Sequence, residues 1–269
     1  MISSHIALSI VMPAFNEENR LSSTLDEFSQ WVNQNLDINI ELIIVNDGST
    51  DKTETVVQSY IIKYNWIKLI NTTHVGMMNA IVTGIKNAKY DLIGTLEADS
   101  PVHPKYFISF LPYMDENDIV IGSRFLGKEV KGKSLARRVI SKMNSLLFTF
   151  LFACPIKDPQ ISFRLYRKTC IQKILPILSL KHDGLKSSEI AVKAHSLGFK
   201  LMEIPVDYTH NIDSKAVPGG IRAIKVTALA TLALFQLWFQ SIKEYRDGVI
   251  PFCPVYNKNI IDYLIGNKK

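Results

Sequence analysis

The stretch IELIIVNDGSTD (Ile40–Asp51) decides the fold. Its first half is a mostly apolar run of strand length, and its second half is rich in the turn-forming residues Asn, Asp, Gly and Ser. Apolar residues at helical spacing come next, at Val56, Val57, Tyr60 and Ile61. The stretch therefore predicts a buried strand that ends in a polar turn and leads into a helix.

The same unit recurs on both sides of this stretch. Strands are predicted at residues 6–12, 40–45, 67–70, 92–96 and 118–122, and helices at 21–32, 56–61, 76–86 and 104–111. Alternating strands and helices predict an α/β fold with a doubly wound, largely parallel sheet. Ligands of such sheets bind beyond the carboxyl ends of the strands. The polar residues that follow each strand are therefore the candidates for function.

Length and composition suit one α/β domain with an appendage, or two small domains. The chain has 269 residues, of which 47% are hydrophobic, so its core needs neither disulfides nor a metal for stability. Cys154, Cys170 and Cys253 are widely spaced and form no CxxC pair, which indicates reduced thiols in a cytosolic setting. The first apolar run stops at Pro13, and we expect a strand there and not a signal peptide.

The net charge of +6 is concentrated in one region. Seven basic residues lie between Arg124 and Lys142, opposed only by Glu129. A solvated surface, a phosphate site and a contact with anionic lipid are all compatible with this pattern. We expect no nucleic-acid partner, because no binding motif is present. Residues 226–242 are almost uncharged but shorter than the ~20 residues of a spanning segment, so we expect a helix that lies on a membrane or packs on the domain, with a spanning helix as the alternative.

Acidic residues follow three of the predicted strands. Glu17 and Glu18 come after the first, Asp47 after the second, and Glu97 with Asp99 after the fourth. An acid-x-acid pair offers two hard oxygen ligands, which suit Mg²⁺ or Mn²⁺. The alternative is that these residues only form turns and helix caps. The sequence lacks GxGxxG, P-loop and GxSxG motifs, so it indicates no classical dinucleotide site, P-loop or hydrolase elbow.

These clusters belong to a series of segments that, taken in order, resembles the family 2 glycosyltransferases. The series resembles more closely the polyprenol-phosphate and dolichol-phosphate sugar transferases, such as the mannosyltransferases among them. Its segments are IVMPAFNEE (10–18), VNDGSTD (45–51), LEADS (96–100) with Pro104, IGSRF (121–125), DPQISFR (158–164), EIAVKA (189–194), residues 197–206 and Ser214-Lys215. We therefore expect a glycosyltransferase domain over residues 1–215 and a membrane-associating helical extension over 216–269.

The resemblance implies a GT-A fold and an inverting, metal-dependent hexosyltransferase. The hexose would be mannose from GDP-mannose or glucose from UDP-glucose, and the acceptor a polyprenyl or dolichyl phosphate at the cytoplasmic face of a membrane. For the donor, the resemblance implies a base pocket of Pro13, Ala14, Phe15 and Glu17, a base or ribose contact at Asp47, and ribose and diphosphate contacts at Ala98 and Asp99. It implies that Asp99, with Glu97, holds Mg²⁺ or Mn²⁺. It also implies an acceptor-phosphate site of Arg124 with Arg137 or Arg138, and closure of the site by Ser214 and Lys215.

Four positions depart from the family pattern: Glu97 replaces the usual Asp, Pro101 replaces a polar ligand, and Met78 and Ser162 stand where glycine is common. Two alternatives therefore stay open. The acceptor could be a glycan hydroxyl, with Asp158, Asp183 or Glu189 as general base. The chain could also be a catalytically degenerate nucleotide-sugar-binding subunit of a membrane complex. The sequence leaves the oligomeric state open.

Overall fold

The computed structural model describes residues 6–74, 76–127, 135–179, 185–209 and 221–251, with the backbone alone at 135–141, 186 and 221–230. Within this part of the chain, seven strands form one sheet in the order β3-β2-β1-β4-β6-β5-β7. They are β1 (Ala7–Ala14), β2 (Asn39–Asp47), β3 (Ile67–Thr72), β4 (Leu92–Thr95), β5 (Ile119–Ser123), β6 (Arg164–Arg167) and β7 (Leu201–Pro205). Only β6 runs antiparallel to its neighbours β4 and β5, which confirms the largely parallel sheet.

The centre of the sheet is apolar along almost its whole length. Residues 8–14 of β1 and 40–47 of β2 are all buried, as expected of parallel strands covered on both faces. Val11 pairs with Ile43, and the register continues to Ala14 opposite Asn46. Because β1 and β2 end at the same level, the loops that follow them are brought together at one edge of the sheet.

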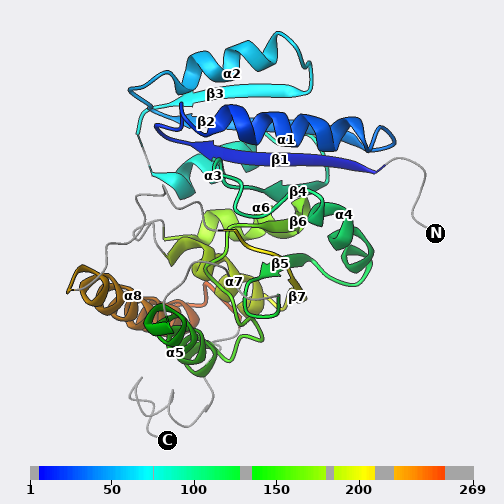
Figure 1. Ribbon diagram of the computed structural model, residues 1–269. Coiled ribbons are helices and arrows are strands. Elements are labelled where there is room, and N and C mark those ends of the chain that lie inside the picture. The colour runs from blue at the N-terminus through cyan, green and yellow to red at the C-terminus, as the bar shows by residue number, and fades with distance from the viewer. Residues whose placement is uncertain (1–5, 75, 128–134, 180–184, 210–220, 252–269) are drawn as a thin grey trace, which may run out of the picture.

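Helices flank the sheet (Figure 1). They are α1 (Leu21–Asn33), α2 (Thr53–Ile61), α3 (Met77–Lys86), α4 (Tyr106–Phe110), α6 (Lys168–Ile174) and α7 (Lys186–Ser196), with the short 3₁₀ turns η1 (Leu111–Asp115) and η2 (Leu175–Ile177). The Tyr60 hydroxyl of α2 donates to the Asp26 carboxylate of α1 at 2.6 Å, which joins these two helices. Every helix and strand predicted for residues 6–122 is present, with ends shifted by a few residues.

Two longer helices, α5 (Leu135–Phe152) and α8 (Ile221–Arg246), lie side by side at the end of the molecule away from β1–β3 (Figure 1). Asn144 and Thr231 are 3.3 Å apart across their contact, and Leu234 of α8 is buried. An ion pair between the buried Lys193 of α7 and Glu244 holds the carboxyl end of α8 against α7. The helix expected at 226–242 is therefore present and longer than predicted.

No helix within the described residues has the length and apolar character needed to cross a membrane. The predicted boundary between residues 215 and 216 lies outside the described residues.

The sequence pattern predicted no strand at Arg164–Arg167, because the arginines at both ends mask the apolar residues between them. Arg164 is nevertheless fully buried, since its guanidinium donates to the carbonyl oxygens of Ile161 and Pro159 at 2.9 and 2.6 Å.

Candidate functional site

A cavity of about 350 Å³ opens beyond the carboxyl ends of β1, β2 and β4. We call it the strand-end cavity. It is lined by Pro13, Ala14, Phe15, Glu17, Asp47, His74, Gly76, Met77, Glu97, Ala98 and Asp99. The residues predicted from sequence for the donor and the metal, other than Ser214 and Lys215, are therefore brought together in one place. His74, Gly76 and Met77 were not among the predicted site residues.

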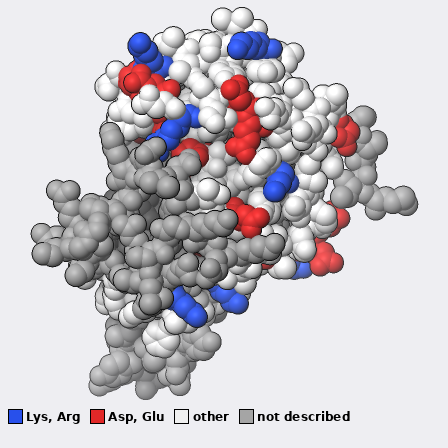
Figure 2. All heavy atoms as spheres, viewed as in Figure 1, with Lys and Arg blue, Asp and Glu red and all other residues white. Residues whose placement is uncertain are grey.

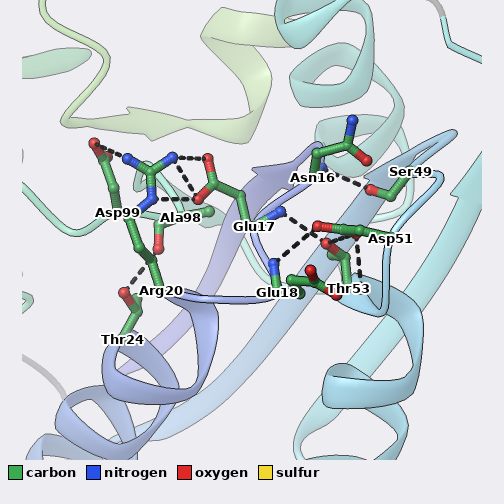
Figure 3. Close-up of polar contacts among 10 residues, drawn as sticks. All are labelled: Asn16, Glu17, Glu18, Arg20, Thr24, Ser49, Asp51, Thr53, Ala98 and Asp99. Atoms are coloured by element: carbon green, nitrogen blue, oxygen red, sulfur yellow. Dashed lines mark hydrogen bonds and ion pairs between the residues drawn. The ribbon is translucent and has the colours of Figure 1, made fainter. Parts of the chain in front are cut away.

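The loop after β1 is fixed by the loop after β2 (Figure 3). The Asn16 amide donates to the Ser49 hydroxyl at 3.0 Å, and the Glu17 amide donates to the Thr53 hydroxyl at 2.8 Å. Asn16 has a φ of 55°, in the left-handed region that Asn tolerates better than most residues. These bonds hold Phe15 and Glu17 at the rim of the strand-end cavity.

Asp47 organises the loop after β3. Its carboxylate is buried and accepts a hydrogen bond from the Gly76 amide at 3.0 Å, and it lies 3.0 Å from Nδ1 of His74. Gly48 has a φ of +70°, and a Cβ atom there would lie only 2.7 Å from the His74 backbone nitrogen. The turn therefore requires glycine both for its conformation and for the close approach of the two loops.

Phe15 and His74 form an aromatic wall of the strand-end cavity. Their ring centroids are 4.2 Å apart and the ring planes meet at 25°, so the rings are stacked. Phe15 is 41% exposed, which leaves aromatic surface for a further flat ring such as a nucleobase. The sequence showed no sign of this role for His74, because nothing in its neighbourhood marks the stacking that the fold creates.

Arg20 stands between two carboxylates of the strand-end cavity (Figure 3). Its guanidinium makes two hydrogen bonds of 2.8 Å to Glu17, and one of its nitrogens lies 4.0 Å from the Asp99 carboxylate. Burial raises the pKa of Glu17, and the nearby Arg20 only partly opposes this. Thr24 donates to the Ala98 carbonyl oxygen at 2.7 Å, so α1 also fixes the backbone between the two predicted metal ligands.

Glu97 and Asp99 suit a divalent cation that is shared with a phosphate ligand. Burial raises the pKa of Glu97, a hydrogen bond from Ser162 opposes this, and the Asp99 carboxylate raises it further. A cation placed between the two carboxylates would relieve that repulsion. Within the described residues, no group of three or more His, Cys, Asp or Glu side chains is placed to hold a metal. Mg²⁺ is commonly bound by one or two carboxylates, with phosphate and water completing its shell, so the pair fits.

Arg124 lies outside the strand-end cavity and lines a second one of about 90 Å³, which we call the helix-side cavity. The other lining residues are Phe125, Asn144, Ser145, Phe148, Asp158, Pro159, Gln160 and Leu234. Its walls therefore include residues of both α5 and α8. Arg124 and Glu97 are close enough to influence each other's ionisation, so the two cavities are neighbours.

Asp158 binds Arg124 closely. Its carboxylate, 1% exposed, accepts from Nε and Nη2 of Arg124 at 2.8 and 2.6 Å and from the Arg124 amide at 2.9 Å. The pairing raises the pKa of Arg124 although burial opposes this, so the guanidinium stays charged. A carboxylate engaged in this way does not suit a general base. Glu189 lines neither cavity and binds the amide and hydroxyl of Ser179 at 2.7 and 3.1 Å.

The remaining predicted residues are not placed by the structure. Arg137 and Arg138 belong to the part of α5 whose backbone alone is described. Ser214, Lys215 and Asp183 lie outside the described residues.

Comparison with known sequences decides the family. The sequence model of glycosyl transferase family 2 matches residues 9–175, which is more than half of the chain. This chain belongs to glycosyl transferase family 2. It is 32% identical over 243 residues to the dolichyl-phosphate beta-glucosyltransferase ALG5A of Trichomonas vaginalis, covering 86% of this chain and 74% of that one. It is 26% identical over 260 residues to ALG5C of the same organism, covering 92% and 77%.

Solved structures support the fold of this family 2 member. The mannosyltransferase PcManGT from Pyrobaculum calidifontis, in complex with GDP-Man and Mn²⁺, matches with a TM-score of 0.57 at 12% identity and covers 97% of this chain and 78% of that one. The mannosyl-3-phosphoglycerate synthase from Rubrobacter xylanophilus gives 0.56 at 14% identity, covering 90% and 75%. The expected GT-A fold is therefore confirmed, and the chain is a glycosyltransferase.

Proposed function

We propose that this glycosyltransferase moves glucose from UDP-glucose to dolichyl phosphate with inversion at the sugar carbon. The arrangement of the two cavities carries the proposal, because an acidic, aromatic strand-end cavity adjoins a helix-side cavity that is lined by an arginine with only 18% of its side chain exposed. The choice of glucose and dolichyl phosphate follows the two relatives, both named dolichyl-phosphate beta-glucosyltransferases. A β-linked product from an α-linked nucleotide sugar requires inversion.

The strand-end cavity is the donor side in this proposal. The nucleobase stacks beside Phe15 and His74, and the diphosphate lies toward Gly76 and Met77, where the amino end of α3 favours an anion. Glu97 and Asp99 would hold Mg²⁺ or Mn²⁺, which when bound neutralises the charge that develops on the departing nucleoside diphosphate. Ser214 and Lys215 are proposed to close over the donor.

The helix-side cavity is the acceptor side. A phosphate oxygen already carries charge and needs no strong base, but it must be held in line with the sugar carbon. Arg124 is suited to hold it, since guanidinium groups bind phosphate through directed, charge-assisted hydrogen bonds. Arg137 or Arg138 is proposed as a second contact. The binding of Asp158 to Arg124 favours a phosphate acceptor over a hydroxyl acceptor, which requires a base.

We further propose that α5 and α8 lie on the cytoplasmic face of a membrane. Each helix exposes apolar side chains at spacings of three and four residues: Met143, Leu146 and Phe150 on α5, and Leu232, Phe235 and Phe239 on α8. Large apolar side chains exposed along a helix favour binding at the lipid interface. The helix-side cavity is bordered by the same two helices, so a lipid phosphate could enter it directly from the membrane.

The test is transfer of labelled sugar to lipid by the purified full chain. It is incubated with dolichyl phosphate, Mg²⁺ or Mn²⁺, and labelled UDP-glucose or GDP-mannose, and label in the organic extract is counted. We expect a labelled lipid from UDP-glucose and its loss with a chelator. Label from GDP-mannose alone would overturn the choice of donor. Donor binding without any labelled lipid would overturn the proposed reaction and favour a hydroxyl acceptor or a non-catalytic subunit.

A further inference from the structure

Tyr208 lies close to one residue of each cavity, Arg124 and Glu97. It follows β7, and its ring centroid is 5.2 Å from Cζ of Arg124, a distance typical of a cation–π contact. The same residue lines a narrow crevice together with Glu97 and Pro101. Burial raises the pKa of the Tyr208 hydroxyl, and the charges of Glu97 and Asp99 raise it further, so the phenol stays neutral. Tyr208 is thus an uncharged ring beside both the acceptor arginine and the metal carboxylates.

The Arg124 guanidinium is held from two directions. Asp158 binds its Nε and Nη2, and its Cζ atom lies over the Tyr208 ring. Asp158 is itself anchored, because its amide donates to the Glu203 carboxylate of β7 at 2.6 Å. A guanidinium has five N–H donors, and Asp158 takes two of them, so three are not committed to Asp158.

Without these contacts, Arg124 would have a competing partner. It is close enough to Glu97 for each charge to affect the other, and opposite charges in a partly buried site attract strongly. An arginine that moved onto Glu97 would neutralise a carboxylate needed for the metal. It would also withdraw hydrogen-bond donors from the acceptor phosphate.

We propose that Asp158 and Tyr208 are positioning residues that fix Arg124 toward the acceptor phosphate and keep it away from Glu97 and Asp99. Tyr208 acts through the face of its ring, and its hydroxyl is not needed for this role. The inference rests on the proposed transfer to a lipid phosphate. It extends that proposal by two residues outside the predicted phosphate site: the sequence marked Asp158 only as a possible base, and gave no role to Tyr208.

The decisive variants are Tyr208→Leu, which removes the aromatic face, and Tyr208→Phe, which keeps it. The KM for dolichyl phosphate and the Kd for UDP-glucose, the latter by calorimetry, are measured for each. We expect Tyr208→Leu to raise the lipid KM about tenfold, in keeping with a desolvated cation–π contact, and to leave the donor Kd within about twofold. Tyr208→Phe should stay within about twofold of the wild type on both. Tyr113→Leu, at an exposed tyrosine remote from both cavities, is the control.

Asp158→Asn provides a second readout, because it keeps the shape and removes the charge. It should also raise the lipid KM more than the donor Kd, and its melting temperature shows whether the fold survives the loss of a buried partner. An unchanged lipid KM in Tyr208→Leu, or an equal loss in Tyr208→Phe, would overturn the inference, as would a parallel rise in KM and donor Kd. Failure of the wild type to label any lipid phosphate would overturn the proposed function as well, and it is seen before any variant is made.

Discussion

Four carboxylates line the strand-end cavity, and their neighbours give them different roles. Glu17 is bound by Arg20, and Asp47 is bound by the Gly76 amide, so both shape the walls. Glu97 and Asp99 lie on either side of a backbone that Thr24 fixes, and the Asp99 charge adds to the burial that raises the pKa of both Glu17 and Glu97. Residue type alone does not separate these roles, whereas the hydrogen-bond partners do.

Replacing Asp99 by Asn should abolish most of the turnover while leaving the fold intact. Asn keeps the size of this side chain, which is 22% exposed, but it removes the charge of one of the two proposed metal ligands. We expect kcat to fall about 10²–10³-fold, the range seen when one electrostatic group of an active site is removed. Labelled-lipid assays and a Mn²⁺ titration measure this, with the exposed Glu116→Gln as control. Undiminished turnover would exclude Asp99 as a metal ligand.

Replacing Gly48 by Ala should both destabilise the protein and weaken donor binding. A left-handed φ costs a residue with a Cβ about 1–2 kcal/mol, and here the Cβ would also meet the His74 backbone. Gly198→Ala is the matched control, because Gly198 has a φ of +78° but open space around its Cβ position. Thermal melts should show a loss for both variants and a larger one for Gly48→Ala. Donor affinity should fall only for Gly48→Ala, and equal affinity in the two variants would contradict the link between the loops.

At the scale of elements, Glu41 joins three strands and a loop through its carboxylate. It accepts from the Ser9 hydroxyl of β1 at 2.5 Å, from Lys68 of β3 at 2.6 Å and from the Lys89 amide at 2.5 Å. Burial raises the pKa of Glu41, but these hydrogen bonds outweigh it and hold the pKa below its ordinary value of 4.5. The ionised form is therefore stabilised by folding.

A Glu41→Gln variant should be less stable at neutral pH by about 1–3 kcal/mol, the cost of leaving buried polar groups poorly paired. Because the folded pKa is depressed, the contribution is complete above pH 4.5 and is lost as pH falls through the folded pKa. The difference in unfolding free energy between the two proteins should therefore shrink below pH 4.5. Urea titrations between pH 3 and pH 7, a range that spans pH 4.5, measure this difference in unfolding free energy. A constant difference over this range would contradict the assignment.

Local pattern predicted the elements that carry their own signal. The strands β1–β5 and the helices between them follow from apolar periodicity and turn residues such as those at 46–51, because each is decided by its neighbours in sequence. The strand β6 escaped prediction because Nε and Nη2 of the buried Arg164 are paired with carbonyl oxygens that only the folded chain supplies. His74 and Tyr208 escaped for the same reason, since one gains its role from Phe15 and the other from Arg124.

At the scale of the whole molecule, the location of the positive charge bears on the proposed membrane contact. Figure 2 shows acidic and basic side chains interspersed over the described part of one face. The basic run between Arg124 and Lys142 lies mostly outside the side chains that the structure describes. Three of the seven basic residues, Arg137, Arg138 and Lys142, belong to α5, which also borders the helix-side cavity, and on that helix they would face anionic lipid.

A double substitution of Phe150 and Phe239 by Ser should release the protein from lipid vesicles without impairing the chemistry. These side chains are 69% and 59% exposed on α5 and α8, and losing their burial in lipid should lower the partition coefficient about tenfold. Co-sedimentation with vesicles containing anionic lipid measures it. The control is Leu36→Ser with Ile62→Ser, two apolar residues of 83% and 86% exposure outside α5 and α8.

Turnover separates membrane binding from chemistry in the same variants. A short, water-soluble prenyl phosphate reaches the helix-side cavity from solution, so the Phe150 and Phe239 variant should use it as well as the wild type does. Dolichyl phosphate embedded in vesicles must be reached from the membrane surface, so its use should fall together with vesicle binding. A loss on both acceptors would place the two phenylalanines in the packing of the site. Unchanged vesicle binding, with the control pair reducing it instead, would place the lipid contact on another face of the molecule.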